Sequence, residues 1–399
     1  MKESIALGFG NNVDYEIVWD SQVIDNLTSQ YDIHQDELNI NTVINTERDL
    51  VISILSFLQA GIGGERSVAS SAIIEHFSQN FEKKITLGGT SVRAAIAMRK
   101  LGYTSALHLV TLNDHVRRLI PQDSPYVYSN TQDSLYPHLI VQFGQDTCVQ
   151  AGDIDICTDH PNRIIYHNDT DNITMKLNED FADLIAAARV LLISGFNAMQ
   201  NEALLTDRLA SLSRMMAKLP PDIVVYCEDA GFFDPSFSQL IYRTLAQNIT
   251  IVSLNEDELQ DYVDRKLDLL NASQITDALA DLQKLISVPV IVVHTQYWAL
   301  AYGDNATRFS NALKGGVTMA TTRFRYGDDF TVENHQTIER LPPTPEGALF
   351  AEVLNKLPGN KIYCVPVAQV EQSNATTVGL GDAFVGGFLP ALLTGMETK

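Results

Sequence analysis

The sequence is poor in basic residues. Its 399 residues include 28 Lys and Arg against 49 Asp and Glu, which gives a formal net charge of −21. Proteins bind a nucleic-acid backbone through a basic face, so this balance argues against a nucleic-acid partner. A protein this acidic that binds an anion must compensate the charge locally, through a metal ion, an arginine or a helix N-terminus.

Long apolar runs are also absent, although 45% of the residues are hydrophobic. No run approaches the roughly 18 to 20 residues that span a bilayer, so we predict that the chain is not an integral membrane protein and has no membrane partner. The first residues lead into a strand-like run without the apolar core of a signal peptide, and a cytoplasmic location is expected. The length allows two or three domains.

Cysteine is scarce, and its positions carry little information about function. The four residues are Cys148, Cys157, Cys227 and Cys364. Their spacing is not typical of metal ligands, and two of them lie in apolar, strand-like runs. We therefore expect reduced, buried thiols, as in a cytosolic protein.

The most informative motif is TVGLGD at 377–382, followed by a run of small apolar residues at 385–393. Two glycines let the backbone turn sharply and present N–H groups at a helix start, where the dipole favours anions. Asp382 follows at once, and a carboxylate there suits proton removal from a hydroxyl that attacks a phosphoryl group. The pattern suggests a small-molecule kinase. The alternative is a turn in which the Asp only caps a helix.

A second acidic motif, SLNEDEL at 253–259, follows the apolar run 249–252. Such a run predicts the end of a buried strand. In an open α/β sheet, ligands bind beyond the carboxyl ends of the strands, and carboxylates there hold Mg2+ directly or through water. Asn255 and Glu258 also fit a capping box at a helix start. The two interpretations are compatible.

Together, Asn255-x-x-Glu258 and Gly379-x-Gly381-Asp382 resemble the ribokinase superfamily, and the fuller strings resemble its ADP-dependent glucokinase and phosphofructokinase branch. The resemblance extends in the same motif order from residue 7 to residue 390. It implies an α/β fold of the ribokinase-like, doubly wound type, in which helices flank a mainly parallel sheet and a smaller α+β lid domain is added. It also implies Mg2+-dependent phosphoryl transfer from ADP to a sugar hydroxyl. The implied catalytic residues are the base Asp382 and the anion-binding turn of Gly379, Leu380 and Gly381.

Three more stretches resemble segments of the branch that bind the sugar. They are GFGNNVD at 8–14, AGIGGER at 60–66 and the glycine pair at 88–89. A dinucleotide-binding fingerprint is a weak alternative for the first stretch, because Val13 stands at its third glycine. A flexible surface loop is the alternative for the second. The acceptor-binding residues that the resemblance implies are Asn12, Asp14, Glu65, Gly88 and Gly89.

The nucleotide and metal residues are assigned in the same way. NRII at 162–165 resembles a strand whose arginine reaches nucleotide phosphates, a task that suits a planar guanidinium. VVYCE at 224–228 resembles a strand that ends in His-x-Glu, with Tyr226 in the histidine's place. His294 follows another predicted strand, and we leave it out of catalysis because a lone histidine there is more often structural. The implied sets are Arg163, Asn255 and Val378 for the nucleotide and Glu228, Glu256 and Glu258 for Mg2+.

Gly10, Thr90 and Tyr226 depart from the residues usual in the branch. Three alternatives stay open: an ATP-dependent kinase of the wider superfamily, a sugar- or nucleotide-sensing relative without turnover, and a scaffolding protein. The sequence does not name the acceptor. The segment 140–145, which lies near the acceptor in relatives, has no lysine or arginine, and this favours an unphosphorylated sugar. Arg66 and Arg93 are the residues that would supply the charge for a phosphorylated one.

Short apolar runs alternate with amphipathic helical patterns in the second half of the chain, at 189–194, 202–219, 223–228, 276–287 and 289–294. Such alternation predicts βαβ units and a mainly parallel, covered sheet. In the first half, a helix-rich segment at 21–80 and strand-like runs at 138–143, 163–166 and 173–177 interrupt this pattern. We predict a large domain of residues 1–14, 84–130 and 181–399 and a small lid of residues 15–83 and 131–180. A monomer is expected by default.

Overall fold

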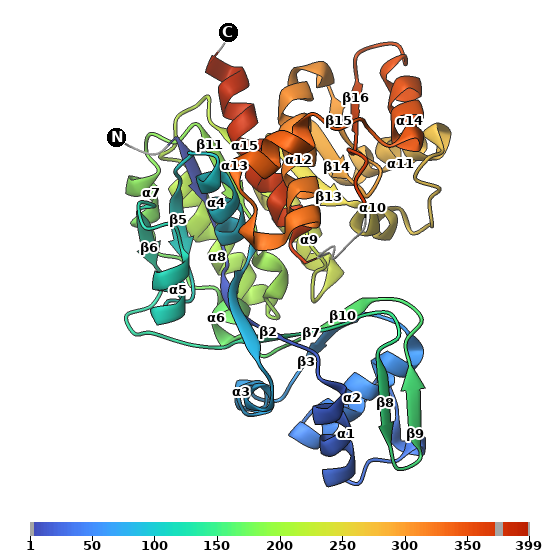
Figure 1. The fold of residues 1–399 in the computed structure, drawn as a ribbon. Helices are drawn as coiled ribbons and strands as arrows, with labels where there is room; N and C mark the ends of the chain where they lie inside the picture. Colours follow the sequence, from blue (N-terminus) through green and yellow to red (C-terminus); the bar gives the residue numbers. More distant parts are fainter. Residues whose placement is uncertain (1–3, 372–377, 398–399) are drawn as a thin grey trace.

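The computed structural model describes residues 4–371 and 378–397, so Thr377 of the glycine motif lies outside the described residues. The described residues form a nine-stranded sheet, a five-stranded sheet and a two-stranded ladder, with helices around them (Figure 1). The nine-stranded sheet has the order β16-β15-β14-β13-β12-β11-β1-β5-β6. Its strands are β1 (Ile5–Leu7), β5 (Ala106–Leu109), β6 (Tyr126–Tyr128), β11 (Val190–Ile193), β12 (Val224–Glu228), β13 (Ile251–Asn255), β14 (Val290–His294), β15 (Trp298–Gly303) and β16 (Ile362–Pro366).

The large sheet is parallel from β6 to β14, and β15 and β16 add antiparallel pairings at one edge. β1 lies between β5 and β11, so the chain builds the sheet outward from β1 in both directions. Such a switch point leaves a crevice beyond the carboxyl ends of the central strands, where ligands bind in open α/β sheets. The segments that follow β1, β11, β12 and β13 therefore border the candidate site.

Side chains from the large sheet pack against helices on both faces. Leu192 and Val292 belong to one buried cluster with α4, α12 and α15, whereas Leu191 and Ile291 belong to a second cluster with α8, α9, α11 and α14. Successive residues of a strand point to opposite faces, so this division is what a doubly wound sheet requires. The helices are α4 (Thr90–Lys100), α5 (Asp114–Leu119), α6 (Thr170–Thr174), α7 (Phe181–Leu184), α8 (Glu202–Met216), α9 (Pro235–Leu245), α10 (Glu256–Val263), α11 (Ala272–Leu285), α12 (Ser310–Tyr326), α13 (Val332–Glu339), α14 (Pro345–Asn355) and α15 (Leu380–Glu397).

The small sheet has one apolar and one polar face. Tyr15, Leu139 and Tyr166 are buried on the apolar face, which α1 (Ser21–Gln30), α2 (Glu47–Ala60) and α3 (Ser71–Phe77) cover. In Figure 1, α1 and α2 lie on the far side of this sheet from the large one. Asp14 and Arg163 alternate with the buried positions and so lie on the polar face. The strands are β3 (Gly64–Ser67), β10 (Asn162–His167), β7 (His138–Phe143), β2 (Asn12–Ile17) and β4 (Lys83–Gly88).

The predicted α/β class, with a mainly parallel sheet flanked by helices, is confirmed. The strand predicted at 173–177 is wrong, because α6 and an irregular segment occupy this region. Asp169 caps α6 by accepting a hydrogen bond from the N–H of Asn172 at 3.0 Å, and Met175 ends the helix with a φ of 32°. Local capping thus overrides the strand-like composition. The domain boundaries stay a prediction. Within the described residues, no helix is both long and apolar enough to cross a bilayer.

Cys148 and Cys157 form a disulfide, so the prediction of reduced thiols is wrong for this pair. They are paired opposite each other in the hairpin of β8 (Cys148–Ala151) and β9 (Ile154–Cys157). Directly opposed residues of an antiparallel pair have neighbouring Cβ atoms, and this register cannot be read from the spacing of the cysteines. Cys227 and Cys364 are free and buried.

Candidate active site

Two glycine turns, one after β1 and one before α4, pack against each other. Gly10 and Gly89 have φ values of 80° and 90°, in the left-handed region that glycine tolerates. A Cβ on Gly89 would lie 2.6 Å from the carbonyl oxygen of Gly10, and a Cβ on Gly88 would lie 2.5 Å from Nδ2 of Asn12. Glycines at 88 and 89 therefore let β2 and α4 meet, which places Asn12 beside the helix.

Asn12 and Asp14 lie together on β2, and both side chains are buried. Nδ2 of Asn12 donates to Oδ1 of Asp14 at 2.5 Å, and Nη2 of Arg93 donates to Oδ2 of Asp14 at 2.7 Å. Arg93 comes from α4 and is also buried. Burial lowers its pKa, but the charges of Asp14 and Asp382 outweigh this effect and raise the pKa above the ordinary arginine value. Arg93 is therefore a charged part of this site.

The glycine motif forms the start of α15, which begins at Leu380 directly after Gly379. Gly379 has a φ of 66°, and its carbonyl oxygen accepts the N–H of Ala383 at 3.0 Å, which closes the first helical turn. The N–H groups of residues 380–382 precede the hydrogen-bond ladder of the helix, so this end suits an anion. Arg323 of α12 donates from Nε to the carbonyl oxygen of Val378 at 2.8 Å and anchors the turn.

Asp382 faces the residues of the small sheet from the first turn of α15. Its Oδ2 lies 3.7 Å from Nε of Arg93, and its side chain is 21% exposed. On the polar face of the small sheet, burial lowers the pKa of Arg163, whereas Glu65 and Asp382 act on it in the opposite direction. Glu65 is exposed and lies in β3, not in a loop. Charged groups of the small sheet and of α4 therefore lie near Asp382.

Glu228 and His294 lie beside the start of α15. His294 Nε2 is 3.1 Å from Oε1 of Glu228, and the His294 ring stacks on Phe384 with centroids 4.6 Å apart. A Cβ on Gly381 would lie 3.4 Å from Cε1 of His294 and 3.9 Å from Oε1 of Glu228. Burial lowers the pKa of His294, but the bond to Glu228 and the charges around it raise the pKa overall. The sequence assigned His294 no role in catalysis, whereas the structure places it against Glu228 and Gly381, two predicted site residues.

The capping box predicted at the start of α10 is confirmed. Oδ1 of Asn255 accepts the N–H of Glu258 at 3.0 Å, and Oε2 of Glu258 accepts the N–H of Asn255 at 2.8 Å. Burial, together with the charge of Asp229, raises the pKa of Glu258 to about 8. Burial also raises the pKa of Glu256, and it raises that of Asp229 to about 6. Burial is the main cause of these raised values, and a bound cation would favour the charged forms of the carboxylates.

The donor set around Glu228 fits a hard divalent cation held partly through water. Oε2 of Glu228 is buried and has no hydrogen-bond partner among the described residues. Carboxylate oxygens are the ligands that Mg2+ prefers, and Mg2+ usually keeps several of its waters. In residues 4–371 and 378–397, no three His, Cys, Asp or Glu side chains are close enough to hold an ion directly. The buried, unpartnered Oε2 of Glu228 is the observation here that suits such an ion.

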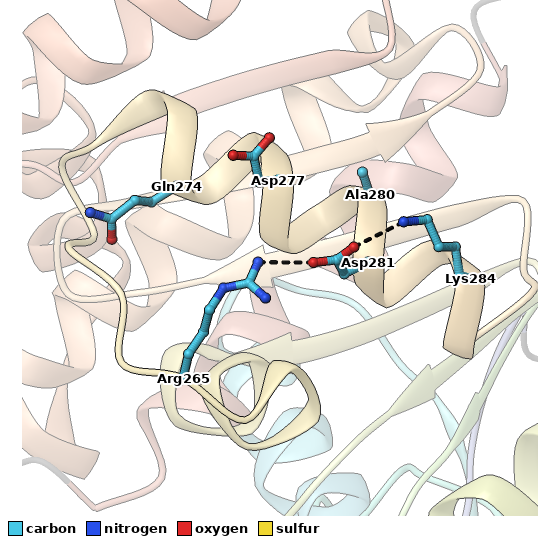
Figure 2. Close-up of a pocket in the computed structure, with 6 residues that line it drawn as sticks. All are labelled: Arg265, Gln274, Asp277, Ala280, Asp281 and Lys284. Carbon is cyan, nitrogen blue, oxygen red and sulfur yellow. Dashed lines mark hydrogen bonds and ion pairs between the residues drawn. The ribbon is translucent and has the colours of Figure 1, made fainter.

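A separate hollow of about 480 Å³ lies on the surface near α10 and α11. Figure 2 shows its lining, in which Arg265 and Lys284 both pair with Asp281, at 3.0 Å and 2.9 Å. None of the predicted site residues lines it, and its two cations are already compensated. The hollow is therefore not the candidate site.

Comparison with known families identifies the family to which this chain belongs. A model described as the ADP-specific phosphofructokinase/glucokinase conserved region matches residues 3–389. The chain belongs to the ADP-specific phosphofructokinase/glucokinase family. Members of this family are ADP-dependent sugar kinases and hence phosphotransferases. No match was found among curated protein sequences.

Solved structures of ADP-dependent kinases share the fold of this family member. A hypothetical ADP-dependent phosphofructokinase from Pyrococcus horikoshii OT3 is 17% identical, with a TM-score of 0.76 over 100% of this chain and 99% of that one. A phosphofructokinase from the same organism, solved with AMP, has the same identity and coverage and a TM-score of 0.77. An ADP-dependent kinase in complex with fructose-6-phosphate and ADPβS is 13% identical, with a TM-score of 0.75 over 100% and 96%. At these identities the likeness shows the fold alone.

The structure brings most of the predicted residues of this sugar kinase into two groups. In the first group, Arg93 connects Asp14 to Asp382 and Gly379, and Asn12, Gly88 and Gly89 lie beside Asp14. In the second group, Glu228 lies against Gly381. Glu256 lies at the start of α10, where its Oε1 accepts the N–H of Gln296 at 3.2 Å. Motif matching gave no role in the reaction to Arg93 or His294. The sequence did carry a signal for Arg93, which is a charged residue among the apolar positions of the helix 90–100. A buried arginine needs acidic partners, so this position predicts an ion pair.

Glu258 is expected to make the metal-free protein less stable at alkaline pH. Its pKa is raised from 4.5 to about 8 in the folded protein, so the folded state holds this proton at pH values where the unfolded chain has lost it. The free energy of unfolding therefore falls as pH rises through this interval, by at most about 1.4 kcal/mol per pH unit for one group. Urea denaturation in the presence of a chelator, at several pH values, measures the slope.

Glu258→Gln is the matched control for this prediction, because Gln keeps the acceptor of the capping box and does not titrate. We expect the free energy of unfolding of this variant to fall less steeply with pH than that of the wild type. The two slopes should become equal towards pH 4.5. Equal slopes in the two proteins would contradict the raised pKa.

Proposed function

We propose that the protein transfers a phosphoryl group from ADP to a hydroxyl of an unphosphorylated hexose and releases AMP. The observation that carries this proposal is that Arg93 contacts two carboxylates. Its Nη2 lies 2.7 Å from Oδ2 of Asp14, and its Nε lies 3.7 Å from Oδ2 of Asp382. It places a carboxylate suited to binding sugar hydroxyls beside a carboxylate suited to removing a proton. The glycine turn at 379–381, which suits an anion, lies next to Asp382 and to the guanidinium of Arg93.

In this mechanism, Asp382 takes the proton of the acceptor hydroxyl as its oxygen attacks the terminal phosphorus of ADP. The bond between this phosphorus and the bridging oxygen breaks, and AMP leaves. N–H groups at the start of α15 donate to the oxygens of the transferring group, whose charge they stabilise. Arg163 binds nucleotide phosphates from the small sheet, Asn12 and Asp14 hold the acceptor with Glu65, and Gly88 and Gly89 let it approach the backbone.

Mg2+ is the proposed cofactor. When bound, it would neutralise part of the phosphate charge. Glu228, Glu256 and Glu258 would hold it through its waters, and the unpartnered Oε2 of Glu228 supports this assignment. Asn255 would contribute by keeping Glu258 in its capping box.

The charges near the acceptor support an unphosphorylated sugar. Arg66 pairs in register with Tyr166 on the apolar face and donates to the carbonyl oxygen of Thr42 at 2.9 Å, so it points away from the site. Arg93 is engaged with Asp14. The polar face of β2 carries Asp14 and Glu16, and negative groups there would repel a second phosphate. Arg66 and Arg93 therefore both have other partners, and neither is placed to bind a phosphate group of the acceptor.

A panel of acceptors tests this proposal. The purified protein is incubated with ADP and Mg2+ and with glucose, fructose, fructose 6-phosphate or glucose 6-phosphate, and the phosphorylated products are identified by mass spectrometry. We expect turnover with one of the unphosphorylated hexoses and a much lower kcat/KM with the hexose phosphates. A preference for fructose 6-phosphate, the ligand of one structural neighbour, would overturn the acceptor class and keep the kinase activity.

A further inference from the structure

Arg93 lies at the centre of the candidate site. Its guanidinium donates from Nη2 to Oδ2 of Asp14 at 2.7 Å, and its Nε lies 3.7 Å from Oδ2 of Asp382. The same Nη2 is 4.0 Å from Oε1 of Glu16. One buried cation therefore joins the carboxylate proposed to bind the acceptor to the carboxylate proposed to take its proton.

The crossing of α4 and α15 directs Arg93 to this place. A Cβ on Gly386 would lie 2.9 Å from Cβ of Ala97, so the two helices touch there with minimal side chains between them. One turn towards the N-terminus of each helix, the corresponding residues are Arg93 and Asp382. The packing of the helices thus brings the guanidinium to the first turn of α15.

The glycine turn leaves room for this guanidinium. A Cβ on Gly379 would lie 2.8 Å from Nη1 of Arg93 and 3.2 Å from Oδ2 of Asp382. Arg93 therefore lies directly against Gly379, at the start of α15. A guanidinium has donors in a rigid, planar fork, so it can hold two carboxylates in one relative orientation. An ammonium group carries its charge at a single point and cannot do the same.

Stability alone does not explain a buried arginine among acids. Desolvation offsets much of the attraction in a buried ion pair, so such a pair contributes little net stability. Asp14 and Glu16 from β2, Asp382 from α15 and Asp328 from the turn at 327–329 all act on Arg93. The carboxylates closest to its nitrogens, Asp14 and Asp382, are the two that the reaction needs.

We infer that Arg93 is a positioning residue for phosphoryl transfer, which fixes Asp14 and Asp382 relative to each other so that the bound acceptor hydroxyl meets its base. The inference rests on the proposed function. Nη2 at the tip of the side chain holds Asp14, whereas Nε on its stem faces Asp382. The two contacts can therefore be separated by substitution.

Arg93→Lys and Arg93→Met separate them. Lys keeps a charge at the tip, so we expect acceptor KM to stay near the wild-type value while kcat falls about 10²-fold, as for a misplaced catalytic group. Met removes both contacts, so we expect the same loss of kcat and, in addition, an acceptor KM about tenfold higher, which corresponds to one lost charged hydrogen bond. Far-ultraviolet circular dichroism and thermal unfolding, which do not depend on ligand binding, report whether each variant is folded.

Arg99→Met is the matched control, because Arg99 lies on the same helix and pairs with Asp123 on the surface at 2.9 Å. It is expected to leave kcat and acceptor KM unchanged. Arg93→Lys decides the question even if Arg93→Met fails to fold. Wild-type-like kcat in Arg93→Lys, or equal losses of kcat and acceptor affinity, would overturn the positioning role. A wild-type protein without turnover would instead overturn the proposed function, so the two failures are distinguishable.

Discussion

Replacing Asp382 with Asn is expected to lower kcat by about 10²- to 10⁴-fold, the range for loss of a general base. Asn has nearly the shape of Asp but cannot accept the acceptor proton at neutral pH. Asp382 is placed in the first turn of α15, 3.7 Å from Arg93 and next to the glycine turn. Because binding of ADP does not require the base, its dissociation constant should change little. Initial rates of AMP formation and calorimetric ADP binding measure the two quantities.

Asp114→Asn is the control for this substitution. Asp114 also lies in the first turn of a helix, α5, but its side chain is fully exposed and its nearest charged partner is Arg117 at 3.5 Å. We expect wild-type kcat for this variant. If Asp382→Asn also retained most of the wild-type kcat, another group would have to remove the proton and the assignment of Asp382 would be wrong.

Gly379→Ala is expected to lower kcat by about 10²- to 10³-fold, the cost of disturbing one donor of an anion-binding turn. An alanine at a φ of 66° is strained, by about 1 to 2 kcal/mol. Its Cβ would also lie 2.8 Å from Nη1 of Arg93, so the guanidinium or the turn has to move. Both effects displace the N–H groups at the start of α15. Steady-state kinetics with ADP and the sugar measure the loss, and thermal unfolding measures the smaller change in stability.

Gly395→Ala offers a control on the same helix. A Cβ there would have no heavy atom within 4 Å, and alanine favours a helix more than glycine does. We expect unchanged kcat and unchanged or slightly higher stability. Similar kinetics for Gly379→Ala and Gly395→Ala would contradict the role of the glycine turn.

The sequence predicted the large sheet well because its signals are local. Apolar runs at 223–228 and 289–294 became β12 and β14, and the helical pattern at 202–219 became α8. A parallel strand buried on both faces is apolar over its whole length, so it contrasts sharply with the amphipathic helices between strands. The capping box of Asn255 and Glu258 was equally readable, since it depends on residues three positions apart.

The features that were missed depend on distant parts of the chain. Arg93 meets Asp382 only because α4 and α15 cross at Ala97 and Gly386, and no local pattern encodes that crossing. His294 reaches Glu228 across the intervening strand β13. The disulfide likewise depends on the register of β8 and β9. Motif matching reads residues that are close in sequence, so a contact between distant segments escapes it.

Product analysis with each donor tests the central claim most directly. The protein is supplied with Mg2+, the preferred sugar and either ADP or ATP, and phosphorus NMR identifies the products. We expect AMP and sugar phosphate to form in equal amounts from ADP, only when the sugar is present. Sugar phosphate formed from ATP but not from ADP would contradict the account, and so would ADP binding without any sugar phosphate from either donor.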